Sequence, residues 1–221
     1  MGRLYADLKE ITERVSEMGN LSLSMLKRAT DSLISPDAGS AEDVIKDYDR
    51  ISFLDSLIEE EALRILILYQ PMASDMRFTA TVLKIITHLE RIGKYSKNIA
   101  KAVVFLRDKE TKYRMDEIYV MCNVAVEMVN GVVKAFESRD IKDLENYSAL
   151  DDKLDGNRCS VIENNVKHMA NDADHADAYT YFISIAKYLE RVGDNACKIA
   201  EKIIYMVSGK HVDLDGTAKT L

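Results

Sequence analysis

The chain has 221 residues, of which 47% are hydrophobic and 30% charged, a composition typical of a globular protein with one medium or two small domains. Its formal net charge of −7 argues against a nucleic-acid-binding protein, because contacts with phosphates need a basic surface. Only 9 Gly and 2 Pro are present, and Trp is absent. This composition favours long helices over strands, which would need more frequent turn residues.

Apolar residues recur at helical spacing along most of the chain and predict six helices. In chain order, they cover roughly residues 3–34, 41–69, 72–107, 113–138, 141–170 and 175–208. The first break is Ser35–Ser40, which combines Pro and Gly with cap-forming Ser and Asp. The second is Gln70–Pro71, where Pro suits the first turn of the next helix. The tail after Gly209 lacks periodicity and is expected to fray.

Cysteine spacing and hydropathy indicate a cytoplasmic protein. The three cysteines are far apart and form no Cys-x-x-Cys, which argues against a disulfide framework and a structural zinc site. The first fifteen residues are charged throughout, so no secretion signal is expected. The longest apolar run, Ile65–Tyr69, is too short to span a bilayer.

The two halves of the sequence repeat each other. His88-Leu-Glu-Arg-Ile-Gly-Lys94 is matched one hundred residues later by Tyr188-Leu-Glu-Arg-Val-Gly-Asp194, and each segment is followed by an Ile-Ala pair. A duplication of this kind dictates the architecture. We therefore predict an all-α protein of two tandem three-helix bundles related by pseudo-twofold symmetry, one formed by residues 1–110 and the other by residues 111–221.

Two pairs of carboxylates stand at helical spacing in the second half. Asp151 and Asp155 lie four residues apart on the fifth predicted helix, as do Glu190 and Asp194 on the sixth. Residues at this spacing share one helical face. Antiparallel packing of the two helices would bring the four together as a set of oxygen ligands for a cation. A solvated acidic face is the other interpretation, as is neutralisation by Arg191 and Lys198.

The repeated segments resemble the PhoU family of phosphate-uptake regulators. The stretch Leu63–Lys101 is similar to the first PhoU repeat, with its Gln-Pro-x-Ala-x-Asp-x-Arg and Leu-Glu-Arg-Ile-Gly elements. Asn146–Gly209 resembles the second repeat, including the closing Tyr-x-x-x-Gly. The resemblance extends over nearly the whole chain in register.

The resemblance implies a regulatory adaptor without enzyme activity. Such an adaptor would restrain the phosphate-specific ABC transporter through contact with its ATPase. It would also help a sensor histidine kinase, where one exists, to control phosphate homeostasis. A homodimer is implied as well, reaching the membrane only through its partners.

The resemblance further implies surface metal ions held by paired (Glu/Asp)-x-x-x-Asp motifs. In the second repeat these motifs map intact onto Asp151, Asp155, Glu190 and Asp194. In the first repeat the same positions are Tyr48, Ser52, Glu90 and Lys94, and we expect Lys94 to neutralise Glu90 through a helical ion pair. Any iron, zinc, manganese or magnesium should therefore bind at the second repeat only.

Asp75 and Arg77 open the third predicted helix within the Gln-Pro-x-Ala-x-Asp-x-Arg element. Negative charge in a first turn complements the helix dipole, which alone explains Asp75. The resemblance adds a role for both residues in contacting partners.

Two other classes of protein remain as alternatives to the adaptor. One is a metal-dependent helical-bundle enzyme that uses the second-repeat carboxylates, although the chain contains no Glu-x-x-His of the di-iron type. The other is a purely structural coiled-coil partner, against which the hundred-residue repeat argues.

Overall fold

The computed structural model describes residues 2–35, 38–109 and 116–214. These residues contain helices and no strand, in agreement with the predicted all-α class. The elements, in order, are α1 (Gly2–Ile34), α2 (Ala38–Tyr69), α3 (Ala73–Leu106), α4 (Asp116–Ser138), the 3-10 helix η1 (Lys142–Asn146), α5 (Tyr147–Asn171), the 3-10 helix η2 (Ala173–His175) and α6 (Ala176–Ser208).

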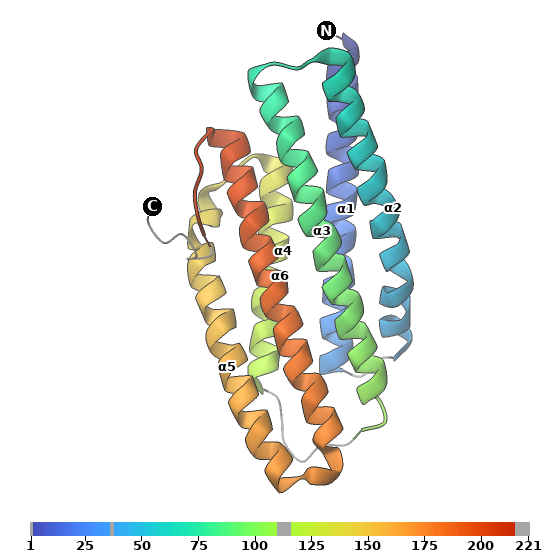
Figure 1. The fold of residues 1–221 in the computed structure, drawn as a ribbon, viewed down its shortest axis with the longest axis vertical. Coiled ribbons are helices and arrows are strands. Elements are labelled where there is room, and N and C mark those ends of the chain that lie inside the picture. The colour runs from blue at the N-terminus through green and yellow to red at the C-terminus, as the bar shows by residue number, and fades with distance from the viewer. Residues whose placement is uncertain (1, 36–37, 110–115, 215–221) are drawn as a thin grey trace.

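The six long helices form two three-helix bundles that lie side by side (Figure 1). Helices α1, α2 and α3 pack on one another, and so do α4, α5 and α6. The two bundles meet mainly along α3 and α6, with a smaller contact between α1 and α4. The predicted architecture of tandem three-helix bundles is therefore confirmed. The predicted boundary between residues 110 and 111 lies outside the described residues, as does the predicted start of the fourth helix at residue 113.

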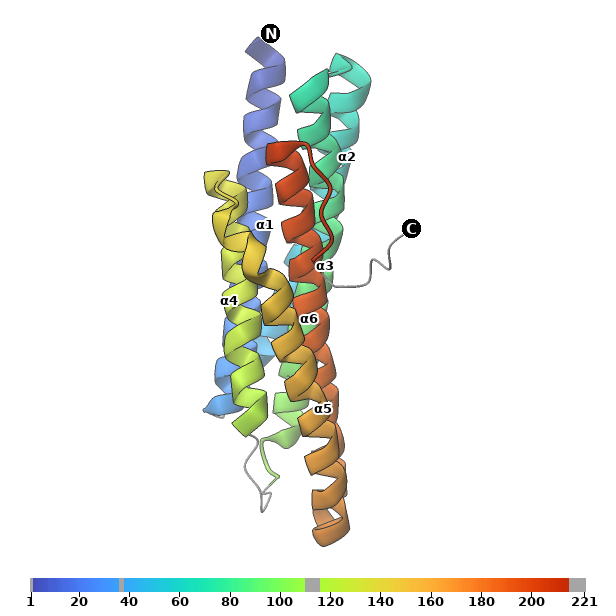
Figure 2. The ribbon, with the colours of Figure 1, turned by 90° about the vertical axis from the view of Figure 1, so that its left-hand side faces the viewer.

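Helices α3 and α6 run antiparallel, and both views show them in contact along their length (Figures 1 and 2). Arg77 near the start of α3 meets Met206 near the end of α6, whereas Phe105 at the other end of α3 stacks on Tyr181. Residue numbers thus rise on one helix as they fall on the other. This is the arrangement expected when a twofold axis relates the two repeats.

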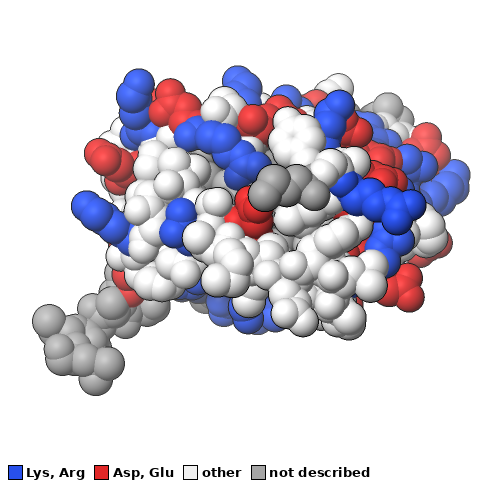
Figure 3. Space-filling model, turned by 90° about the horizontal axis from the view of Figure 1, so that it is seen from above, with Lys and Arg blue, Asp and Glu red and all other residues white. Residues whose placement is uncertain are grey.

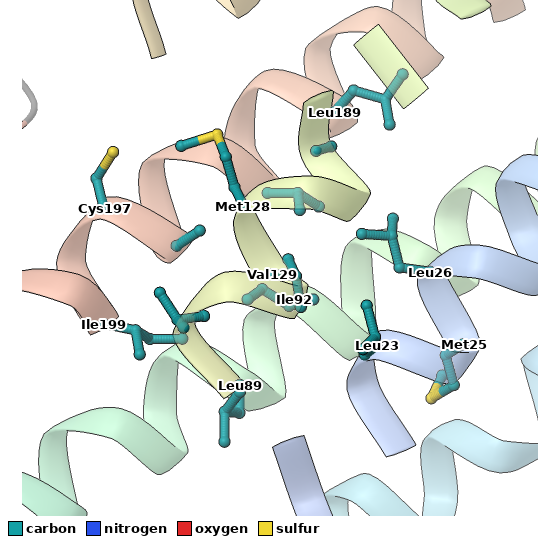
Figure 4. Close-up of a cluster of buried hydrophobic side chains, with 14 of the residues drawn as sticks. Leu23, Met25, Leu26, Leu89, Ile92, Met128, Val129, Leu189, Cys197 and Ile199 are labelled. Atoms are coloured by element: carbon teal, nitrogen blue, oxygen red, sulfur yellow. The ribbon is translucent and has the colours of Figure 1, made fainter. Parts of the chain in front are cut away.

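One hydrophobic core joins the two bundles. The close-up in Figure 4 shows apolar side chains from α1, α3, α4 and α6 converging on one another. The labelled side chains are Leu23, Met25, Leu26, Leu89, Ile92, Met128, Val129, Leu189, Cys197 and Ile199. Because four helices from both repeats contribute to it, the core holds the halves together as well as each half internally.

Helix α4 is long and apolar enough, by length and composition, to cross a membrane. Its apolar residues are nevertheless packed against α1, α5 and α6, and Ile118, Met121 and Val129 are fully buried. The helix therefore has the burial pattern of a core helix.

The turns show local detail that the periodicity did not predict. Pro71 precedes α3 instead of entering its first turn, and the non-glycine residues Gln70 and Ala73 on either side have φ values of 44° and 48°. The fifth predicted helix divides into η1 and α5, and a second 3-10 turn precedes α6. Short 3-10 turns are common at helix ends, where backbone groups lack intrahelical partners.

The tail after Gly209 is ordered as far as Leu214, so the expectation that it frays is wrong for this part. Gly209 adopts the left-handed conformation (φ 75°), and its N–H donates a hydrogen bond to the Tyr205 carbonyl at 2.8 Å, which caps the end of α6. The chain then turns back along α6 (Figure 2). His211 stacks on Tyr205, and the Leu214 N–H donates to the buried Glu201 at 3.1 Å.

Candidate functional site: an acidic cleft between the repeats

All four carboxylates predicted in the second repeat line a single cleft of about 520 Å³. Asp151 and Asp155 come from α5, and Glu190 and Asp194 come from α6. The remaining lining residues are His88, Arg91, Tyr95, Arg191, Asn195 and Lys198. The helical spacing and the repeat thus predicted which carboxylates share a surface, whereas the contribution of α3 to the cleft was not predicted.

Close packing of α5 on α6 brings the two pairs together. Gly193 lies between Glu190 and Asp194, and a Cβ atom at this position would come within 2.3 Å of Leu154 Cδ1 and 3.3 Å of Asp151 Oδ1. A glycine here allows α5 to approach, with the buried Leu154 filling the space above it. The approach places the buried Asp151 in the lining of the cleft.

Two arginines face the α6 carboxylates. Arg158 Nε, from α5, lies 3.5 Å from Glu190 Oε1, and Arg191 Nη1 donates to Asp194 Oδ2 at 2.9 Å. Arg191 was expected as a neutralising group, whereas Arg158 was not. Lys198, also expected there, lines the cleft as well and pairs with Glu201 at 3.1 Å. No sequence pattern pointed to Arg158, because its contact depends on how α5 is rotated against α6.

Burial is the main influence on the titration of Glu190. Desolvation raises the pKa of this half-buried carboxyl, and the charges of Asp194 and Asp155 raise it further. Arg158 and Arg191 act in the opposite direction, but the net shift is upward. The guanidinium groups therefore offset part of the cost of holding a carboxylate in this cleft.

The cleft has suitable donors for a hard metal ion but not a suitable arrangement. Carboxylate oxygens are the ligands that magnesium, manganese and calcium prefer. Among the described residues, however, no three His, Cys, Asp or Glu side chains are grouped closely enough to hold an ion. The arginines stand against two of the four carboxylates, so the residues as arranged do not fit a metal centre.

In the first repeat, two of the positions that match the acidic pairs are occupied by a hydrogen-bonded tyrosine and glutamate. The Tyr48 hydroxyl donates a hydrogen bond to Glu90, and the Lys97 ammonium lies 4.0 Å from the centre of the Tyr48 ring. Desolvation, together with this hydrogen bond, raises the pKa of Tyr48 to about 12. Ser52 is exposed one turn further along α2.

The expected ion pair between Lys94 and Glu90 does not form within the described part of the chain. Lys94 is exposed to solvent, whereas Glu90 is half-buried and faces α2. An exposed ion pair between flexible side chains contributes little, so the phenol of Tyr48 is the better partner for this carboxylate.

Two side-chain pairs cross between α3 and α6 at related positions. His88 Nδ1 lies 2.9 Å from Asn195 Oδ1, and the rings of Tyr95 and Tyr188 stack with centres 6.1 Å apart. The hundred-residue repeat converts one pair into the other, because it relates His88 to Tyr188 and Tyr95 to Asn195. Burial is the main reason that the pKa of His88 is lowered, which favours its neutral form. The repeat contained the signal for these contacts, but the antiparallel packing was needed to interpret it.

Asp75 and Arg77 lie at the opposite end of α3 from the α4 connection. Asp75 stands in the first turn of α3, as its dipole-based explanation requires, and lines a second cleft of about 530 Å³ beside α1. Arg77 Nε donates to the Met206 carbonyl at the end of α6, at 3.3 Å. Arg77 therefore ties the two repeats together at this end.

Comparison with known proteins gives the same family over both repeats. The sequence profile of the PhoU domain matches residues 15–103 and 118–203. A relative from Clostridium acetobutylicum, described as a phosphate-specific transport system accessory protein PhoU homolog, is 30% identical over 95% of this chain and 96% of its own.

Two solved structures have the same fold. PhoU from Pseudomonas aeruginosa superposes with a TM-score of 0.89 at 29% identity, covering 93% of this chain and 99% of the other. The phosphate transport system regulatory protein PhoU from Streptococcus pneumoniae gives 0.85 at 26% identity, over 96% and 100% of the two chains. With two matched domains, a full-length relative and this arrangement of helices, the chain belongs to the PhoU family.

Proposed function

We propose that this protein is a regulatory adaptor that restrains phosphate uptake by the phosphate-specific ABC transporter and takes part in phosphate-dependent signalling. The observation that carries the proposal is the match to proteins named as accessory or regulatory components of phosphate transport, which extends over more than nine-tenths of the chain. The protein would act in the cytoplasm by contact with the transporter ATPase, and with a sensor histidine kinase where one is present.

The charge arrangement in the acidic cleft supports action by contact instead of turnover. A catalytic carboxylate needs access to a substrate proton or a metal-bound water. Glu190 and Asp194 instead face Arg158 and Arg191: the first pair runs between α5 and α6, and the second lies within α6. A metal-dependent enzyme is therefore the less favoured function, and hydrolysis of phosphate esters lost on Glu190→Gln would support it against the adaptor.

The turn between α2 and α3 offers a surface for the proposed contact. Ile67, before the turn, is 74% exposed and Met72, within it, is 81% exposed; the half-buried Asp75 follows in the first turn of α3. Figure 3 views the end of the bundle that carries this turn: charged side chains of both signs lie along its edges, and uncharged surface fills much of the rest. Apolar side chains rimmed by charge are typical of protein-binding surfaces.

The experiment is gene deletion with complementation, measured as phosphate uptake in phosphate-replete medium. Deletion should raise uptake or derepress phosphate-starvation genes, and the wild-type gene should restore repression. Met72→Lys should fold normally yet fail to restore it, because a charge at the centre of an apolar contact is costly.

Phe53→Lys is the matched control, because Phe53 is also a large exposed apolar residue (64%) but lies on α2 away from the turn. This variant should complement as well as the wild type. Unchanged uptake on deletion would contradict the adaptor function. Equal complementation by both variants would contradict only the proposed contact surface.

A further inference from the structure

The two repeats carry opposite charges at one matching position. A Cβ atom on Gly93 of α3 would lie 3.2 Å from Ile51 of α2, just as one on Gly193 of α6 would meet Leu154 of α5. Ile51 and Leu154 therefore occupy matching places. Four residues further along each helix stand Asp55 in the first repeat and Arg158 in the second.

In the second repeat this position supplies a cation that bridges two helices. Arg158 reaches from α5 to Glu190 on α6, with its side chain 32% exposed and that of Glu190 14% exposed. Arg191 pairs with Asp194 one turn further along α6, and the charge of Glu190 is the main reason that the pKa of Arg191 is raised. One guanidinium group thus reaches Glu190 from α5, and the other pairs with Asp194 within α6.

In the first repeat the same position supplies an anion. Asp55 lies near enough to Glu90 for the charge of that carboxylate to raise its pKa, in addition to the larger effect of burial. Asp55 Oδ1 is buried and has no hydrogen-bond partner among the described residues. The residue that faces the motif glutamate is therefore repulsive in one half of the molecule and attractive in the other.

We infer that Arg158 and Arg191 are the built-in counter-ions of the acidic cleft, and take the place of the divalent ions that paired (Glu/Asp)-x-x-x-Asp motifs are expected to hold. Arg158 Nε lies 3.5 Å from Glu190 Oε1 and makes no hydrogen bond to any residue that the structure describes, so the guanidinium attracts α6 to α5 through charge, as a metal ion between the two helices would. Arginine keeps its charge at every physiological pH, so the bridge needs no ion from solution. A divalent cation can bind among the four carboxylates only after the guanidinium of Arg158 is removed.

The test uses Arg158→Asp in the full-length chain, which copies the residue of the first repeat. Manganese is the probe, measured by calorimetric titration and by thermal unfolding. The wild type should show neither saturable manganese binding nor a change in Tm of more than about 1 °C with EDTA or manganese. Arg158→Asp should have a lower Tm than the wild type in EDTA, should bind manganese saturably, and should recover about 5 °C on saturation.

Two further variants keep the test decisive. Arg158→Gln removes the charge without adding repulsion, and it should also gain manganese binding if Arg158→Asp fails to fold. Asp55→Arg is the reciprocal change in the first repeat. It should raise the Tm by supplying Glu90 with a counter-ion and leave manganese binding unchanged.

Three outcomes would overturn the inference. Elemental analysis could find a stoichiometric metal ion in the native wild-type protein, as the motif spacing alone predicts. EDTA could lower the Tm of the wild type. Both Arg158 variants could fold and bind manganese no better than the wild type.

Discussion

Asp55 is held in surroundings that favour its neutral form. Burial raises the pKa of its carboxyl, and the neighbouring charges of Glu90 and Glu59 raise it further. The folded protein therefore binds this proton more tightly than the unfolded chain does. The stability contributed by such a group is full below its unfolded pKa and is lost as the pH rises through its folded pKa.

Replacing Asp55 by Asn should therefore raise the free energy of unfolding at pH 7. The amide has nearly the same shape and carries no charge, so the repulsion from Glu90 disappears. The gain should shrink as the pH falls toward about 4, where the wild-type carboxyl also becomes neutral. Urea denaturation at several pH values would measure it. Asp49→Asn, at an exposed position on the same helix, is the control and should change little; a gain for Asp55→Asn that persists at low pH would show that charge is not the cause.

At the level of the elements, each repeat relies on one close approach between its second and third helices. In the second repeat this is the contact of Gly193 with Leu154, and in the first it is the contact of Gly93 with Ile51. The space at the two positions differs. An added Cβ would be 2.3 Å from its nearest neighbour at Gly193 but 3.2 Å at Gly93.

Gly193→Ala should accordingly destabilise the protein by about 1–2 kcal/mol, because overpacking a buried contact outweighs the better helix propensity of Ala. Gly93→Ala should lie within about 0.5 kcal/mol of the wild type, because Ile51 has to move by only a few tenths of an ångström and the propensity gain of about 1 kcal/mol offsets that strain. Denaturant midpoints of the two variants provide the comparison. Equal losses of unfolding free energy in the two variants would mean that the two glycine contacts are equally tight.

Sequence periodicity predicted the long helices because each has a continuous apolar stripe that must be buried, as in α3 and α6. It did not predict the backbone of Gln70 and Ala73, whose positive φ angles are imposed by how α2 and α3 meet. The grouping of the four acidic residues followed from spacing within each helix. The pairing of Arg158 with Glu190 did not, because a long side chain reaching across two helices depends on their relative rotation. The prediction of a bound metal ion at this cleft stays untested.

Over the whole molecule, the shared core makes the two repeats depend on each other. Leu89 and Ile92 of α3 lie among side chains from α4 and α6 as well as α1 (Figure 4). Unfolding one repeat alone would expose this surface on the other. We therefore expect a single cooperative transition, with circular dichroism and tyrosine fluorescence giving the same midpoint. Two separated transitions would indicate that the halves unfold independently.

The side-chain pairs that cross between α3 and α6 differ on the two sides of the pseudo-twofold axis. In an assembly of two identical half-length chains, the contacts on either side of the symmetry axis would have to be the same pair of residues. Here one is His88 with Asn195 and the other is Tyr95 with Tyr188. Covalent fusion has released these positions from identity, so each side of the axis can be adjusted separately by mutation. The same freedom lets one half place Asp55 where the other places Arg158.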